Sequence, residues 1–167
     1  SSTTTAARCR GDAALRRRHG CQHRMNHAEV QAFFEGYRSA FDRLDGDAVA
    51  DLWHVPSGIA DSGGPAGGGR LTWWPDEAAM RANHHALCAH YRQAGYASAS
   101  FNIDQCVPLG PDHAFARLQW TLRRADGSLL QRFGTGYQLL RTAQGPRVLL
   151  CTAYQENLKE MTPDAAQ

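Results

Sequence analysis

The sequence has no long apolar run, and no segment approaches the about 20 residues that a membrane-spanning helix needs. A disulfide framework is also missing. Of the five cysteines, Cys9 and Cys21 lie near the N-terminus and leave an odd number in the rest of the chain. There is no apolar region of a secretory signal, so the sequence predicts free thiols, a cytoplasmic location and no membrane partner.

Basic charge is scarce outside the first residues. Residues 1–24 carry six Arg and one Asp, whereas the remaining chain carries 12 basic and 15 acidic residues. Such a mildly acidic body predicts no nucleic-acid partner. Residues 1–24 could be a transit peptide, a nucleic-acid-binding arm, or codons upstream of a start at Met25. The third interpretation is favoured, because Asn26 and Glu29 form a capping-box pattern directly after Met25.

The spacing of apolar residues predicts three helices. Residues 26–44 place apolar side chains on one face with a period of 3.6. A shorter helix follows and ends before Pro56, and a third runs from Pro75 to Gly95, which favours a helix end.

Extended segments make up most of the remainder. Residues 57–62 and 70–74 predict short strands around "GGPAGGG", which lacks the Lys-Ser/Thr ending of a phosphate-binding loop. Four long strands are predicted at 96–109, 114–124, 129–141 and 146–157. Helices followed by a meander of strands indicate an α+β fold with helices on one face of a sheet.

This element order, together with "FDRLDGDAVADLW" and "DGSLLQRFGTGYQLLR…PRVLLCTAYQ", resembles the nuclear transport factor 2-like superfamily, including its SnoaL-like members. The resemblance covers residues 26–158 and leaves 1–24 and 159–167 as tails. It implies a bent antiparallel or mixed sheet wrapped around three helices, with an apolar pocket at the open end. Some relatives are cofactor-free isomerases, cyclases, hydrolases or dehydratases, and others bind or associate without catalysis.

The resemblance also implies a homodimer formed through the outer sheet face. One face of the strand at 114–124 carries polar side chains that suit either solvent or such a contact. These side chains are Arg117, Gln119, Thr121 and Arg123.

Alignment with ketosteroid isomerases places Asp61 at the position of their proton-shuttling carboxylate. We expect burial at the mouth of an apolar pocket to raise the pKa of this carboxyl group, although an exposed turn-capping Asp is the alternative. The two enolate-binding donors of those enzymes fall near Ser39 and Gly136, which cannot replace them, so steroid isomerase activity is not expected. Tyr37 could supply one donor only in a different register.

The stretch "NHHALCAHY" at 83–91 contains three histidines and one cysteine. His84 shares an apolar helical stripe with Cys88, but third and fourth metal ligands are missing, so no metal site is predicted. His84 is either a hydrogen-bonded core residue or a pocket residue that acts with Asp61 as acid or base.

Aromatic side chains suit the walls of a pocket for a flat apolar ligand, and equally the interior of a core. The candidate pocket residues are Tyr37, Trp53, Trp73, Trp120 and Tyr137. Two hypotheses follow. The chain is a cofactor-free enzyme acting on a small hydrophobic molecule through Asp61 and His84, or it is a non-catalytic ligand-binding or dimerisation module.

Overall fold

The computed structural model describes residues 23–154 of the chain. The elements in chain order are α2 (His27–Asp42), α3 (Gly46–Ala50), β1 (Trp53–Asp61), the single-turn helix η1 (Pro65–Gly67), β2 (Arg70–Trp74), α4 (Glu77–Gln93), β3 (Tyr96–Pro108), β4 (His113–Arg124), β5 (Leu129–Thr142) and β6 (Gly145–Tyr154). The expected α+β class and the order of the main elements are confirmed. Of the two predicted tails, residues 1–22 and 159–167 lie outside the described residues.

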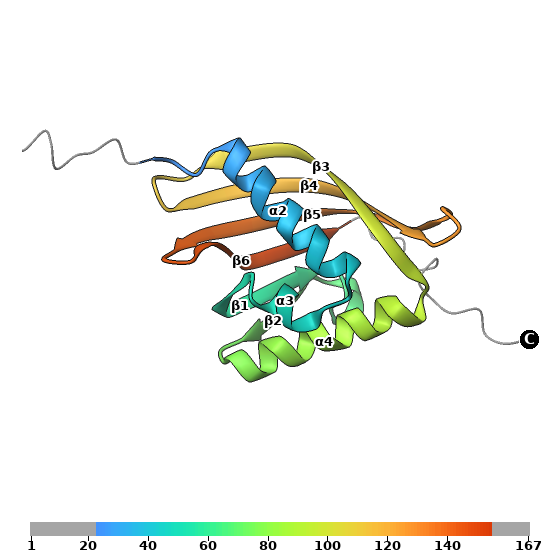
Figure 1. The fold of residues 1–167 in the computed structure, drawn as a ribbon. Helices are drawn as coiled ribbons and strands as arrows, with labels where there is room; N and C mark the ends of the chain where they lie inside the picture. The colour runs from blue at the N-terminus through green and yellow to red at the C-terminus, as the bar shows by residue number, and fades with distance from the viewer. Residues whose placement is uncertain (1–22, 155–167) are drawn as a thin grey trace, which may run out of the picture.

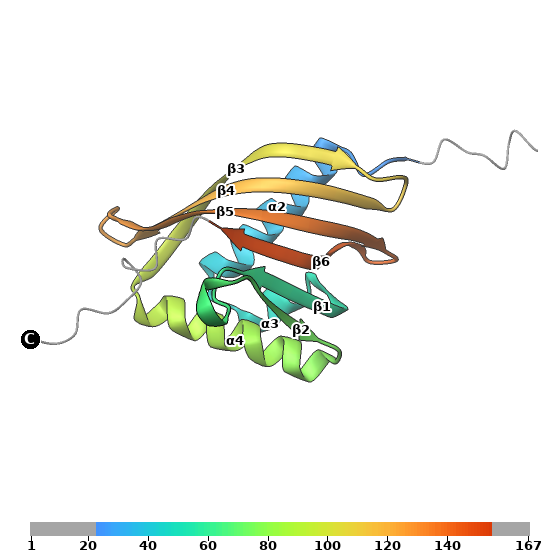
Figure 2. The same cartoon turned by 180° about the vertical axis from the view of Figure 1, so that it is seen from behind.

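The strands form one mixed sheet in the order β2-β1-β6-β5-β4-β3. All neighbours are antiparallel except β1 and β6, which pair in parallel. The sheet is open, with β2 and β3 as its edges. Figures 1 and 2 show that α2, α3 and α4 all cover the same face, and that residues 23–154 place no helix on the other face.

The sequence sets the limits of the two long helices. The Asn26 side chain accepts a hydrogen bond from the Glu29 N–H at 2.9 Å and begins α2 as predicted. Asp76 caps α4 in the same way through the Ala79 N–H. Gly95 follows α4 with a φ of 87°, a left-handed conformation that glycine adopts without strain.

The second helix is shorter than predicted. It is capped by Asp45 and ends at Ala50, whereas the prediction extended it through Trp53. Trp53 instead begins β1, where it pairs with Val148 of β6. Pairing with a distant strand therefore overrode the local apolar pattern, as tertiary contacts commonly do in short segments.

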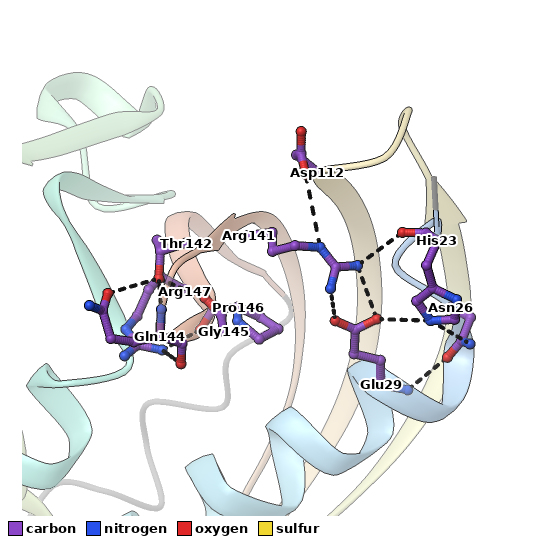
Figure 3. A network of polar contacts seen from close by, with 10 residues as sticks. All are labelled: His23, Asn26, Glu29, Asp112, Arg141, Thr142, Gln144, Gly145, Pro146 and Arg147. Carbon is purple, nitrogen blue, oxygen red and sulfur yellow. Dashed lines mark hydrogen bonds and ion pairs between the residues drawn. The ribbon is translucent and has the colours of Figure 1, made fainter. Parts of the chain in front are cut away.

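A polar clamp joins the start of α2 to the end of β5 (Figure 3). Arg141 donates two hydrogen bonds to the Glu29 carboxylate, at 2.6 and 3.1 Å, and a third to the His23 carbonyl oxygen at 3.3 Å. Asp112 lies 4.0 Å from the same guanidinium. The Glu29 carboxylate thus pairs with Arg141, where the sequence predicted that it would reach back to its own helix cap.

The core lies between the inner face of the sheet and the helices. Its largest fully buried apolar side chains come from the first residues described, from both long helices and from the three C-terminal strands β4, β5 and β6. They include Met25, Val30, Phe34, Met80, Leu118, Leu130, Leu139 and Val148.

Candidate functional site

A cavity of about 280 Å³ lies between the inner sheet face, the second half of α2 and the middle of α4. Aromatic and aliphatic side chains form most of its wall, with a few polar groups among them. The wall includes Tyr37, Phe41, Trp53, Ile59, Trp74, His84, Leu87, Tyr91, Tyr96, Ala99, Trp120, Leu122, Phe133, Thr135, Tyr137, Cys151 and Ala153, and four further residues, Asp61, Arg70, Thr72 and Asn83, complete it.

Four of the five aromatic residues that the sequence nominated line this cavity: Tyr37, Trp53, Trp120 and Tyr137. Trp73 does not, because its indole is 47% exposed. Successive residues of a strand point to opposite faces, so the buried Trp74 faces the cavity where Trp73 was expected.

Trp73 packs on the opposite face of the same hairpin. It pairs with Gly58 of β1, and a Cβ atom added to Gly58 would lie 2.6 Å from the Trp73 ring. In "RLTWW", alternate residues face opposite sides of the strand, but the sequence does not show which set faces the cavity. The pairing of β2 with β1 decides that Trp74 does.

His84 is fully buried in the cavity wall. Its ring lies 4.6 Å from the Trp53 ring and 6.2 Å from the Trp74 ring, measured between centroids. Neither ring nitrogen has a hydrogen-bond partner within residues 23–154. Burial, with smaller contributions from His85 and Arg81, lowers the pKa of His84 to about 4, so the imidazole is neutral at pH 7.

Hydroxyl groups cluster in another part of the wall. The Trp120 N–H donates to Thr135 Oγ1 at 3.1 Å and to the Tyr137 hydroxyl oxygen at 3.2 Å. Burial raises the pKa of both Tyr37 and Tyr137 well above the ordinary value. These phenols therefore stay protonated and available as donors.

The cavity wall contains a hydroxyl group from the first long helix. Tyr37 lines the wall, whereas Ser39, the aligned residue, does not and instead accepts a hydrogen bond from Arg43. The two residues are two positions apart in a helix of 3.6 residues per turn, so they lie on different faces.

Asp61 and Arg70 form an ion pair in the cavity wall. They are cross-strand partners at the end of the β1–β2 hairpin, and Arg70 Nη2 lies 2.7 Å from Asp61 Oδ2. The Gly63 N–H donates to the other carboxylate oxygen at 2.8 Å. Arg70 lowers the pKa of Asp61 more than burial raises it, so the expected upward shift is wrong and the group is a carboxylate at pH 7.

Arg70 was missed because its approach to Asp61 depends on the length and path of the glycine-rich connection, residues 62–69. Strand alternation places Thr72 on the same face as Arg70 and Trp74. Tyr91 shares the helical stripe of His84, and that spacing could have nominated it.

Among residues 23–154, no three His, Cys, Asp or Glu side chains lie close enough to form a metal site. The described helices also include none long and apolar enough to cross a membrane. Cys88, Cys106 and Cys151 form no disulfide within the described residues.

Several solved structures share this fold. A ketosteroid isomerase-like protein from Erwinia carotovora atroseptica aligns over 75% of this chain and 92% of its own, with a TM-score of 0.54 and 19% identity. An NTF-2 like protein of unknown function from Shewanella oneidensis aligns over 75% and 96%, with a TM-score of 0.60 and 12% identity.

A third, from Streptomyces avermitilis, is proposed to be a dehydratase of the NTF2-like family. It aligns over 75% of this chain and 92% of its own, with a TM-score of 0.55 and 14% identity. Identities this low show a common fold and leave activity open.

No protein of curated function matches the sequence. A family described as NTF2-like protein (DUF6841) matches residues 28–156, most of the chain. The match spans every strand and helix that builds the cavity, and the chain therefore belongs to this NTF2-like family.

Proposed function

We propose that the protein binds a compact, neutral and mainly apolar small molecule in the cavity between α2, α4 and the sheet. The observation that carries this proposal is a largely aromatic wall in which Asp61 and Arg70 neutralise each other and His84, Tyr37 and Tyr137 are uncharged at pH 7. His84 is neutral because its pKa is lowered to about 4, and the Tyr37 and Tyr137 phenols are neutral because their pKa values are raised. A charged ligand would lose its hydration there, and the charges of Asp61 and Arg70 already pair with each other.

The size of the cavity restricts the ligand further. An apolar cavity of about 150 Å³ holds one benzene ring. The volume here is about 280 Å³, which suits a molecule of one or two rings.

Binding can be tested by screening one- and two-ring hydrocarbons, ketones and phenols with thermal unfolding and tryptophan fluorescence. Ala99 lines the cavity, so Ala99→Phe should fill it and abolish the response. Ser100 is exposed on the next position of β3, and Ser100→Phe adds the same ring outside the cavity as a matched control. Equal responses in the two variants would contradict binding at this site.

A second candidate function is cofactor-free catalysis on the bound molecule. It is favoured by one observation, that Asp61 and His84 line the same cavity. The Asp61 carboxylate would accept a proton and the neutral His84 would orient the substrate. Ion pairing makes Asp61 a weaker base than a free carboxylate near pH 7, so binding is the better supported function.

The two functions differ in their response to Asp61→Asn. This change removes the proton acceptor but leaves the cavity volume nearly unchanged. An enzyme that turns over an isomerisable or dehydratable ligand should lose at least about 100-fold in kcat, with ligand affinity nearly constant. A binding protein would show no turnover in either form.

The open face of the sheet is proposed to contact a second copy of the chain. Leu71 and Trp73 project from this face with 61% and 47% exposure. With strands about 4.8 Å apart and a rise of about 3.3 Å per residue, the open face of the six-stranded sheet has an area on the order of 900 Å². This is close to the area that a standard interface covers on each partner. Arg117→Glu and Arg123→Glu should shift the sedimentation coefficient from that of a dimer to that of a monomer.

A further inference from the structure

Two buried polar groups in the cavity have complementary hydrogen-bonding capacity. The Trp53 indole can only donate, and its Nε1 has no partner within the described residues. A neutral imidazole accepts at one nitrogen and donates at the other, and neither His84 nitrogen has a partner within residues 23–154. Native proteins rarely leave such buried atoms without partners, so each of them needs an explanation.

The two rings lie side by side in the wall. Their centroids are 4.6 Å apart and their planes are tilted by 45°. One oxygen atom about 2.9 Å from each of two nitrogens can connect nitrogens that are up to about 5.8 Å apart. This span exceeds the 4.6 Å between the two ring centroids.

We propose that the ligand of this cavity is a neutral alcohol or phenol whose hydroxyl group donates to His84 and accepts from the Trp53 N–H. The inference rests on the proposed binding function and adds the chemical class of the ligand. A hydroxyl group both donates and accepts, so it can satisfy the two wall groups at once. A hydrocarbon satisfies neither, and a ketone or ether can accept from Trp53 but cannot donate to His84.

Tyr37 is the protein group that competes for this place. The Trp53 N–H approaches the Tyr37 hydroxyl oxygen closely enough to lower the Tyr37 pKa as a weak hydrogen-bond donor, but the contact lacks the geometry of a full hydrogen bond. The other aromatic ring beside His84 is that of Trp74, with its centroid 6.2 Å away. The surrounding wall thus contacts the apolar part of the ligand, and the His84–Trp53 pair contacts its hydroxyl group.

The test uses thymol, carvacrol and p-cymene as probes with the full chain. The first two are positional isomers of one phenol, and the third is the same molecule without the hydroxyl group. Calorimetry should show the better phenol binding at least about 10-fold more tightly than p-cymene, because the hydroxyl satisfies two buried groups. A hydroxyl without partners would reverse the preference, since its desolvation opposes binding.

Trp53→Phe keeps an aromatic ring and removes only the N–H, so it should reduce the phenol preference by roughly 10-fold. Leu87→Ala is the matched control, because Leu87 lines the cavity without a polar atom and should weaken phenol and hydrocarbon alike. Nitrogen NMR of the histidines in the unaltered protein adds a measurement that needs no variant. Thymol or carvacrol should shift the accepting nitrogen of His84, and p-cymene should not.

The outcomes separate the two proposals. Equal affinity for the phenols and p-cymene, or an unchanged preference in Trp53→Phe, would overturn the hydroxyl assignment and leave a general apolar pocket. No binding of any of the three probes would overturn the proposed binding function itself.

Discussion

The polar clamp at the start of α2 and the cavity beside its second half both contain partly or fully buried polar side chains. In the clamp, Arg141 and Glu29 satisfy each other through two hydrogen bonds, and the His23 carbonyl oxygen takes a third (Figure 3). In the cavity, His84 and Trp53 remain without partners within the described residues. The difference indicates that the clamp serves folding, whereas the cavity keeps unsatisfied groups that folding alone would eliminate.

The largest expected effect comes from acid acting on the cavity. The pKa of His84 is about 4 in the folded chain, compared with the ordinary 6.5, so between these values only the unfolded chain binds the proton. The resulting stabilisation is complete above pH 6.5 and is lost as the pH falls toward 4. Urea unfolding should show that the free energy of unfolding falls by about 3 kcal/mol between neutral pH and pH 4.

His84→Leu is the control for this titration, and it should abolish most of the slope in this pH window. The Asp61 carboxyl also loses stabilisation in acid, but its pKa is lowered from 3.8, so its contribution falls below the window. If His84→Leu kept the full pH dependence of the unfolding free energy, the acid sensitivity would not come from the buried histidine of the cavity.

The clamp provides the next effect. Arg141→Met leaves Glu29 without its partner in a half-buried position and should cost about 2 kcal/mol of unfolding free energy. Arg81→Met is a matched control, since Arg81 pairs with Asp47, Asp51 and Glu77, whose side chains are more than 60% exposed. We expect that change to cost less than about 1 kcal/mol. Urea unfolding midpoints measure both, and a larger loss in Arg81→Met would contradict the satisfied-clamp interpretation.

The smallest effect is expected at the Asp61–Arg70 pair. Arg70 is half exposed, so Asp61→Asn should change the unfolding free energy by less than about 1 kcal/mol. Thermal unfolding at neutral pH provides the measurement. A larger loss would mean that this pair, like the clamp, holds the fold together and is not simply part of the cavity wall.

Much of the fold could be predicted from the sequence, because its signals are local. The Asn26 cap and the apolar spacing of α2 predict that helix, and strict alternation predicts the buried set Ala116, Leu118, Trp120 and Leu122 in β4. The inward position of His84 follows from the same periodicity in α4. Each of these features depends on residues close together in the chain.

The details of the site were less predictable. Whether Trp73 or Trp74 faces the cavity depends on pairing with β1, and a slip of one residue exchanges the two faces of a strand. The downward pKa shift of Asp61 depends on Arg70, which lies across a glycine-rich loop whose path the sequence does not specify. The family alignment placed Asp61 at the mouth of an apolar pocket and gave no indication of its counter-charge.

By itself, the sequence determined the element types, their order and the family resemblance, because capping residues and apolar periods act over a few positions. The tertiary structure decided which polar atoms are paired and which remain free in the cavity. Hydrogen bonds and ion pairs form only between atoms at the correct distance, and that distance is set by the packing of α2, α4 and six strands from distant parts of the chain.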